Sequence, residues 1–138
     1  MTLKVQLDPG AFMPERAHPT DAGADLRTPK RLVLPPHSYI VVDTGIHVEI
    51  PKNYAGHIKS KSGLMANSGV FTHGLVDEGY TGSIRVALFN FGHGYKIFEV
   101  GDKIAQLEIV PVLTPDFEQV ERIEGGERGN RGFGSSGR

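Results

Sequence analysis

Short runs in which apolar and polar residues alternate constrain the fold of this chain more than any other feature. The clearest lies between Ile46 and Ile50, where isoleucine and valine alternate with His47 and Glu49. Alternation with a period of two is typical of a strand with one buried face, and no segment keeps a helical period over three turns. Glycine and proline, 18 and 9 of 138 residues, separate the runs. The sequence therefore predicts an all-β domain, either a sandwich, a jelly roll or a small barrel.

Further runs of this kind are expected to form strands. They comprise residues 3–7, 39–42, 54–58, 84–91, 97–100 and 104–112. Residues 63–69 are the one stretch suited to a turn or two of helix, since Leu64 and Met65 favour a helix and Gly69 would end it. We expect the β-domain to span residues 1–124.

Composition excludes several classes of function. A formal net charge of −1 provides no bulk attraction to nucleic acid or to anionic lipid. No stretch approaches the roughly 18 apolar residues of a membrane span, and the first residues lack the apolar run of a signal peptide. The absence of cysteine rules out disulfides, a thiol nucleophile and a thiolate metal site. We therefore expect a cytoplasmic protein that binds neither nucleic acid nor membranes.

The stretch from Gly74 to Ile84 is the best candidate for a reactive site. Its sequence predicts a tight hairpin, with apolar residues before a glycine-containing turn and alternating apolar residues after it. Asp77 stands at the start of the turn, and Tyr80 follows three residues later. On this stretch alone, a plain hairpin in which the aspartate caps the turn is the simpler interpretation. A turn between rigid strands can also hold a reactive carboxylate in fixed geometry.

The last residues, 125–138, differ in composition from the rest of the chain. Glycine recurs at every second or third position, and Phe133 is the one large apolar side chain. Such a segment cannot bury a core by itself. Three interpretations are open: a disordered tail, an RNA-binding tail with an aromatic ring for stacking, or a flexible lid. In a lid, backbone N–H groups, arginines and serines would bind phosphates while Phe133 stacks on a base.

Five glycine-bearing clusters, in order along the chain, resemble the five sequence motifs of the trimeric dUTPase family, the deoxyuridine triphosphate nucleotidohydrolases. The clusters are residues 22–26, 61–63, 74–84, 101–107 and 128–137. The resemblance runs from Asp21 to Gly137 and covers nearly the whole chain. Its most specific parts are the central stretch and the Gly-Phe-Gly-Ser-Ser-Gly ending.

The resemblance implies a distorted, jelly-roll-like β-barrel that assembles as a homotrimer with active sites shared between subunits. The implied reaction is hydrolysis of dUTP to dUMP and pyrophosphate, which supplies dUMP for thymidylate synthesis and keeps uracil out of DNA. Mg²⁺ is implied as the cofactor, bound through the substrate triphosphate without a direct protein ligand. Residues 125–138 match the family's arm, which closes over the active site.

The motifs also imply roles for individual residues. Asp77 matches the carboxylate that positions and deprotonates the attacking water. Tyr80 matches the residue that packs on the deoxyribose and leaves no room for a 2′-hydroxyl. Asp25 matches a carboxylate near the water shell of the metal. The other residues matched to nucleoside contacts are Phe71, Leu75, Val76, Arg85 and Phe133. The residues matched to phosphate contacts are Lys61, Ser62, Gly63, Gln106, Arg128, Ser135 and Ser136.

Two positions depart from the usual family pattern. Lys61 stands where arginine is usual, and a lysine keeps the charge but lacks the planar bidentate fork. Phe71 stands where some members have asparagine, so only its backbone can contact uracil. The histidines show no paired spacing typical of zinc ligands and are expected to be surface or structural residues. They are His18, His37, His47, His57, His73 and His93.

Two other functions stay open at this point. A dCTP deaminase resembles this fold and oligomer, although the phenylalanine-containing arm fits a dUTPase better, and release of ammonia from dCTP would identify it. A binding or regulatory protein that holds dUTP and signals is also compatible with intact catalytic residues.

Overall fold

The computed structural model describes residues 1–137, which form short β-strands and one short helix. In chain order the strands are β1 (Lys4–Leu7), β2 (Gly23–Arg27), β3 (Leu32–Leu34), β4 (Ser38–Asp43), β5 (Ile46–Glu49), β6 (Tyr54–Lys59), β7 (Val70–Phe71), β8 (His73–Val76), β9 (Arg85–Asn90), β10 (Lys96–Phe98) and β11 (Lys103–Pro111). The helix, α1 (Ser62–Ser68), lies between β6 and β7.

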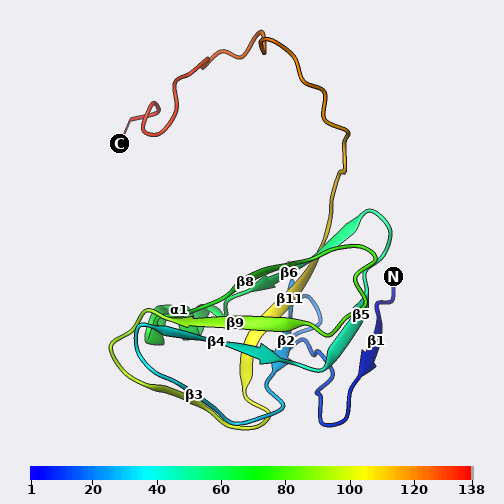
Figure 1. Ribbon diagram of the computed structural model, residues 1–138, viewed down its shortest axis with the longest axis vertical. Coiled ribbons are helices and arrows are strands. Elements are labelled where there is room, and N and C mark those ends of the chain that lie inside the picture. The colour runs from blue at the N-terminus through cyan, green and yellow to red at the C-terminus, as the bar shows by residue number, and fades with distance from the viewer. Residues whose placement is uncertain (138) are drawn as a thin grey trace.

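The strands pair in antiparallel fashion and form two larger sheets and two separate strand pairs. The first sheet has the order β2-β11-β6-β8, the second has the order β4-β9-β7, and the pairs are β1-β5 and β3-β10. Figure 1 shows β4 and β9 crossing the first sheet as a second layer. The expected all-β, jelly-roll-like fold is confirmed, although within residues 1–137 the sheets do not join into one closed barrel.

The hydrophobic core draws side chains from both larger sheets. Leu26, Ile58 and Leu107 project from the first sheet, and all three are at most 2% exposed. Val42 and Leu88 project from the second sheet and are fully buried. Burial of each such aliphatic side chain stabilises the fold by roughly 1.5–3 kcal/mol. The core thus fixes the position of one sheet on the other.

The prediction of a tight hairpin from Gly74 to Ile84 is wrong. β8 pairs with β6, whereas β9 pairs with β4 and β7, so this segment crosses from the first sheet to the second. Before and after this segment, the chain pairs with itself between β7 and β9, where Val70 is opposite Asn90 and Phe71 is opposite Phe89. Alternation reports which side chains are buried, here Val76, Ile84 and Val86. It does not identify the strand with which each one pairs.

The predicted helix is confirmed as α1, and Gly69 ends it. Gly69 has a φ of 68°, in the left-handed region that terminates helices, and its N–H donates to the Met65 carbonyl at 3.1 Å. A Cβ at this position would lie 2.8 Å from the backbone nitrogen of Gly92. Glycine is therefore required here by conformation and by contact. Within residues 1–137, no helix is long and apolar enough to cross a membrane.

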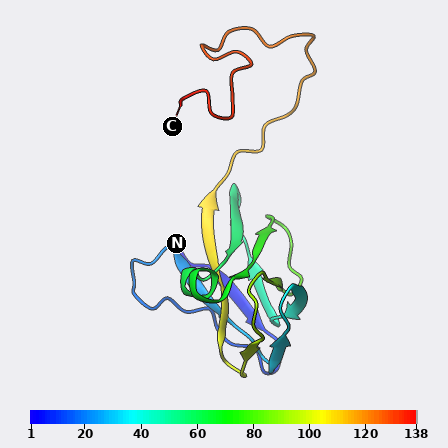
Figure 2. The ribbon, with the colours of Figure 1, turned by 90° about the vertical axis from the view of Figure 1, so that its left-hand side faces the viewer.

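Beyond β11 the chain leaves the sheets. Residues 113–137 extend away from the rest of the molecule with exposed side chains (Figures 1 and 2). We call residues 112–124 the connector and keep the name arm for the residues from 125 onward. The connector carries large apolar side chains that are mostly exposed, namely Leu113, Phe117, Val120 and Ile123.

Candidate active site

Asp77 lies directly after β8, at the start of a tight turn. Val76, the last residue of β8, is buried, whereas Asp77 is exposed to solvent. The backbone N–H of Tyr80 donates to the Asp77 carbonyl oxygen at 3.2 Å and closes the turn. Gly79, with a φ of 87°, adopts the left-handed conformation that few other residues tolerate. A buried strand end and a closed turn thus present one carboxylate to water in a fixed position.

Contacts with other segments hold residues 77–84, which we call the Asp77 turn. The Glu78 carboxylate accepts the backbone N–H of Asn53 at 2.9 Å, in the loop between β5 and β6. The Ser83 hydroxyl donates to the Asp43 carboxylate at the end of β4. This bond is the main reason that the pKa of the Asp43 carboxyl lies below its usual value. The Asp77 turn is therefore held at two places, the loop between β5 and β6 and the end of β4.

The Tyr80 side chain folds back over the turn and lies against Gly82. Its hydroxyl donates to the Ser83 carbonyl oxygen at 2.9 Å. A Cβ at Gly82 would lie 2.5 Å from the tyrosine hydroxyl oxygen and 2.7 Å from the ring carbon that bears it. Any side chain at position 82 would therefore displace the ring. Because Tyr80 is 46% exposed, the fixed ring offers an apolar surface in the same turn as Asp77.

A row of polar side chains crosses the first sheet at one level. Asp25 on β2 is opposite Gln106 on β11, and Gln106 is opposite Lys59 on β6. Lys59 is in turn opposite His73 on β8. Directly opposed residues of antiparallel strands project from the same face of a sheet, so these four side chains share one face. We call them the polar row.

Asp25 is the buried member of the polar row and is only 4% exposed. Lys61 pairs with one of its carboxylate oxygens, and Lys103 pairs with the other at 2.9 Å. Burial alone would raise the pKa of the Asp25 carboxyl, but the hydrogen bonds and charges of the two lysines outweigh burial and lower the pKa. Two cations thus meet at one carboxylate, which leaves net positive charge at this point of the sheet.

Ser60 joins the polar row to the segment between β7 and β8. Its carbonyl oxygen accepts a hydrogen bond from Nε2 of Gln106 at 2.8 Å, and its hydroxyl accepts the backbone N–H of Thr72 at 2.9 Å. Gly23 leaves room for the amide, since a Cβ there would lie 2.3 Å from Oε1 of Gln106. Sequence reasoning misses both Ser60 and Lys103, because their partners lie far along the chain and neither residue type is unusual at such positions.

The structure gathers most of the predicted site residues into three groups. The first, in or beside the Asp77 turn, comprises Leu75, Val76, Asp77, Tyr80 and Arg85. The second, at the polar row and the start of α1, comprises Asp25, Lys61, Ser62, Gly63 and Gln106. The third, in the arm, comprises Arg128, Phe133, Ser135 and Ser136.

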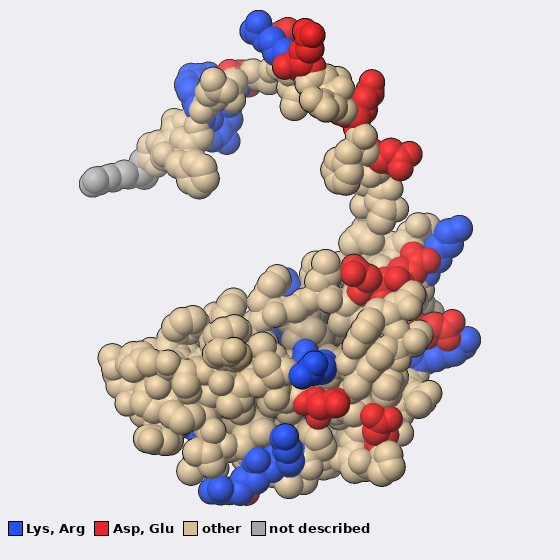
Figure 3. All heavy atoms as spheres, in the orientation of Figure 1, with Lys and Arg blue, Asp and Glu red and all other residues tan. Residues whose placement is uncertain are grey.

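The arm residues contact one another rather than the sheets. Nη2 of Arg128 donates to the Ser135 hydroxyl at 2.8 Å, and Phe133 is fully exposed. In the described part of the arm, the hydrogen bonds are internal. Figure 3 shows mainly acidic side chains, with a basic one among them, along the extended segment, and basic ones nearer its end. The arginines of the described part of the arm are Arg128 and Arg131. In its described residues, up to 137, the arm thus carries two arginines and an aromatic ring, and its hydrogen bonds do not reach the sheets.

Phe71 belongs to a set of aromatic rings on the second sheet. It is opposite Phe89 on β9, which is opposite Tyr39 on β4. The Tyr39 and Phe89 rings stack with centroids 5.4 Å apart, and the Phe91 ring lies 6.3 Å from those of Phe71 and Phe89. Tyr39 and Phe91 are 62% and 67% exposed. This sheet therefore presents a contiguous apolar surface to solvent.

The donor set suits a metal ion carried by a phosphate ligand better than an ion held by the protein. Among residues 1–137, no three or more His, Asp or Glu side chains are grouped to hold a metal. Both oxygens of Asp25 are engaged by lysines. Magnesium prefers phosphate oxygens and water, and ammonium groups also suit phosphate. The residues therefore fit an Mg²⁺ ion bound through phosphates better than one held by a cluster of carboxylates.

The Asp77 turn and the polar row lie apart within one chain. The row crosses β8 at His73, four residues before Asp77, which corresponds to about 13 Å along the strand. Asp25 lies three strands away from β8 in the sheet, about 14 Å across it. A single chain therefore does not place Asp77 beside Asp25.

Comparisons with known proteins point to one family. A family model described as dUTPase matches residues 10–137. A deoxyuridine 5'-triphosphate nucleotidohydrolase from Nocardia farcinica is 46% identical over 136 residues, which cover 96% of this chain and 82% of the relative. The dUTPase of Staphylococcus bacteriophage 80alpha with dUpNHpp superposes with a TM-score of 0.93 at 35% identity over 99% of both chains. A mutant dUTPase from phage phi11 of S. aureus, whose structure concerns the coordination of a structural Mg(II) ion, superposes with a TM-score of 0.84 at 33% identity. That match covers 91% of this chain and 100% of the phage chain.

Proposed function

The chain belongs to the dUTPase family and is a dUTP diphosphatase, and from this premise we propose that Asp77 activates the water that attacks the substrate. The observation that carries the proposal is the exposed Asp77, held in a closed turn with the Tyr80 ring. Hydrolysis of a phosphoanhydride depends mainly on positioning and on neutralisation of charge. Asp77 orients the water and takes its proton as the water oxygen bonds to phosphorus and the bond to pyrophosphate breaks.

We propose that the open edge of β8 reads uracil. Among the strands of residues 1–137, β8 is the last in its sheet and pairs only with β6, so the backbone groups of its other edge are free of a ladder there. Residues Phe71 to Val76 and the backbone of Arg85 border this edge and can offer paired donors and acceptors to a base. The Tyr80 ring packs on the deoxyribose, and Phe133 of the arm stacks on the base.

We propose that the second group of residues binds the triphosphate. Lys61, Ser62 and Gly63 lie together at the start of α1, and Gln106 is tied to the same loop through Ser60. Lys103 adds a second ammonium group beside Lys61, which offsets the lack of an arginine fork there. Mg²⁺ bound to the triphosphate supplies further neutralisation of phosphate charge, with Asp25 near its water shell. From the arm, Arg128, Ser135 and Ser136 complete the phosphate contacts.

We propose a homotrimer in which each active site draws residues from different subunits. The separation of the Asp77 turn from the polar row supports a site completed by another chain, because a reacting water must lie within about 3.5 Å of phosphorus. The exposed aromatic rings of the second sheet and the exposed apolar residues of the connector also favour burial against other copies.

In the cell, we propose that this reaction supplies dUMP for thymidylate synthesis and keeps uracil out of DNA. The cytoplasmic location expected from the sequence stays a prediction.

One assay tests the reaction. The protein is incubated with each deoxynucleoside triphosphate and Mg²⁺, and pyrophosphate is measured. We expect rapid release from dUTP and little from the others. Ammonia released from dCTP, or equal hydrolysis of all the nucleotides, would contradict the proposal.

A further inference from the structure

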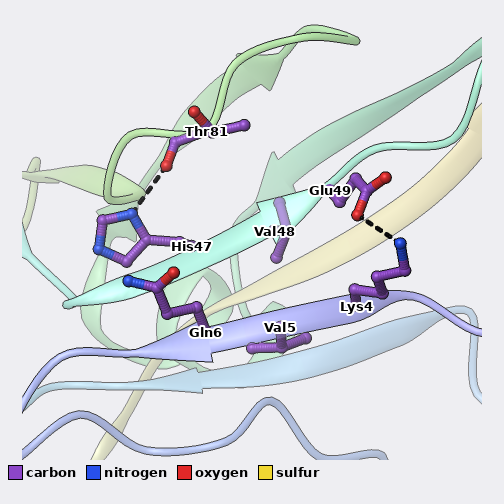
Figure 4. Close-up of a pocket in the computed structure, with 7 residues that line it drawn as sticks. All are labelled: Lys4, Val5, Gln6, His47, Val48, Glu49 and Thr81. Carbon is purple, nitrogen blue, oxygen red and sulfur yellow. Dashed lines mark hydrogen bonds and ion pairs between the residues drawn. The ribbon is translucent and has the colours of Figure 1, made fainter.

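The side chain of His47, on β5, bridges two segments that are distant in sequence. Its Nδ1 lies 2.8 Å from the carbonyl oxygen of Thr81, in the Asp77 turn (Figure 4). Its Nε2 lies 3.0 Å from Oδ1 of Asp8, just after β1. The side chain is only 21% exposed, so the ring is held between its two partners.

Both partners of the ring are acceptors. A carbonyl oxygen has no proton to donate, and an ionised carboxylate has none either. Each ring nitrogen must therefore carry a hydrogen for both bonds to form, and only the imidazolium has two N–H groups. A neutral ring could keep one of the two bonds and would lose the other.

We propose that His47 is a positioning residue that holds the Asp77 turn through Thr81, and that it does so as the imidazolium. The effect of His47 on catalysis rests on the proposed function of the Asp77 turn. Thr81 directly follows Tyr80, so a fixed Thr81 carbonyl limits the movement of the ring that lies on Gly82. Asp8 supports the contact between His47 and Thr81 indirectly, because its carboxylate accepts a hydrogen bond from Nε2 of the same ring.

The charged groups around His47 favour its protonated form. Asp8 contacts the ring from the loop after β1, and Asp43 at the end of β4 also attracts its charge. Arg85, opposite Asp43 on β9, is compensated by that carboxylate. His47 and Thr81 line a pocket together with Lys4 and Glu49, whose side chains pair at 3.0 Å so that their charges cancel (Figure 4).

The bonds to Thr81 and Asp8 raise the pKa of His47, and burial opposes them only in part. We call the paired hydrogen bonds of the His47 ring to Thr81 and Asp8 the clamp. Because the pKa of His47 is raised, the imidazolium that closes the clamp is still present at the pH where a free histidine is half deprotonated, about 6.5. The clamp is released as the pH rises through the pKa of the folded protein.

Nuclear magnetic resonance of ¹⁵N-labelled protein tests the clamp without any substrate. We expect the His47 ring to titrate above the reference value of about 6.5 and to carry hydrogen on both nitrogens below its pKa. The backbone amide of Gly82 shares a peptide bond with the Thr81 carbonyl, so its chemical shift should follow the same titration. In Asp8→Asn the His47 pKa should fall, whereas in His93→Ala it should stay unchanged.

Activity on dUTP across pH tests the positioning role. We expect His47→Ala to lower kcat/KM by about tenfold at pH 6. The difference in kcat/KM between this variant and the wild type should become smaller as the pH rises, because the wild-type His47 then loses its second N–H. His47→Asn places an amide N–H near the site of Nδ1, so it should recover part of the loss without that pH dependence. His93→Ala, which removes a histidine whose ring packs edge-on against His37, should behave as the wild type.

The outcomes separate this inference from the proposed function. A wild-type protein that leaves dUTP intact refutes the proposed function, while the Gly82 amide still decides whether the clamp exists. The inference is overturned if His47 titrates at or below the reference value, or if the Gly82 amide ignores its titration. It is also overturned if the pH profile of His47→Ala parallels that of an active wild type.

Discussion

The hydroxyl of Ser60 accepts the backbone N–H of Thr72 at 2.9 Å and donates to the Thr72 carbonyl oxygen at 3.0 Å. Thr72 is the buried residue at which the chain passes from β7, paired with β9, to β8, paired with β6. At such a crossing neither ladder supplies partners for the backbone. One serine side chain therefore replaces both missing hydrogen bonds, and this lets two neighbouring strands join different sheets.

The first prediction concerns this pair. Ser60→Ala should lower the free energy of unfolding by about 1–3 kcal/mol, because it leaves a buried N–H and carbonyl group unpaired. Chemical denaturation measures the change. Ser38→Ala is a matched control, since its hydroxyl makes a single bond to the Pro35 carbonyl, and its loss should be smaller. Equal losses in the two variants would contradict the bridging role of Ser60.

The second prediction concerns the base. Asp77→Asn keeps the shape of the side chain but removes its ability to take a proton from water. We expect kcat for dUTP to fall by about 10² or more while dUTP binding is largely kept. Asp102→Asn is the control, because the Asp102 carboxylate lies in another turn, where it accepts the backbone N–H of Glu99, and has no proposed catalytic role. Near-normal turnover in Asp77→Asn would refute the assignment of this carboxylate as the base.

The third prediction concerns substrate choice. The edge of β8 should reject the 5-methyl group of thymine, and the Tyr80 ring should leave no room for a 2′-hydroxyl. Sites that leave polar groups unpaired or atoms overlapping can discriminate by about 10⁴ or more. We therefore expect kcat/KM for dTTP and for UTP to be lower than kcat/KM for dUTP by a factor of about 10⁴ or more. Tyr80→Ala should raise kcat/KM relative to dUTP more for UTP than for dTTP. Similar specificity constants for all three nucleotides in the wild type would refute the assignment of substrate choice to the β8 edge and Tyr80.

The fourth prediction concerns shared sites. Asp77→Asn with an intact arm, and a chain truncated after Glu124 with Asp77 intact, should each be nearly inactive. Refolded together at equal ratio, random trimers combine Asp77 of one chain with the arm of another in about a quarter of sites. Activity should return to about that fraction of the wild type. If mass measurements show mixed trimers and no activity returns, Asp77 and the arm of a site belong to the same chain.

The sequence predicts local features of this fold well because they depend on neighbouring residues. Gly69 ends the helix where its conformation requires glycine, and the alternation from Ile46 to Ile50 gives β5. The same alternation does not identify pairing partners. A β8 strand that binds β6 and a β8 strand that binds β9 would show the same buried Val76.

The candidate site likewise contains residues that the sequence identifies and residues that only the fold reveals. Asp25, Lys61 and Gln106 are recognised through their motifs, and the structure places them together. Ser60 and His47 are not recognised, because their roles arise from contacts with residues 12 and 34 positions away. A serine in a loop and a histidine on a strand are ordinary until the fold supplies those partners.

The place of β11 in its sheet has a consequence for how the chain is made. β11 is the last strand along the chain, yet it lies between β2, one of the first, and β6. A nascent chain therefore exposes both flanking edges until residues 103–111 have left the ribosome. Pairing across so long a separation is slow, and unpaired edges invite association with other chains. Premature termination anywhere before β11 leaves a fragment that cannot assemble this sheet, so the protein is committed to its fold only when synthesis is nearly complete.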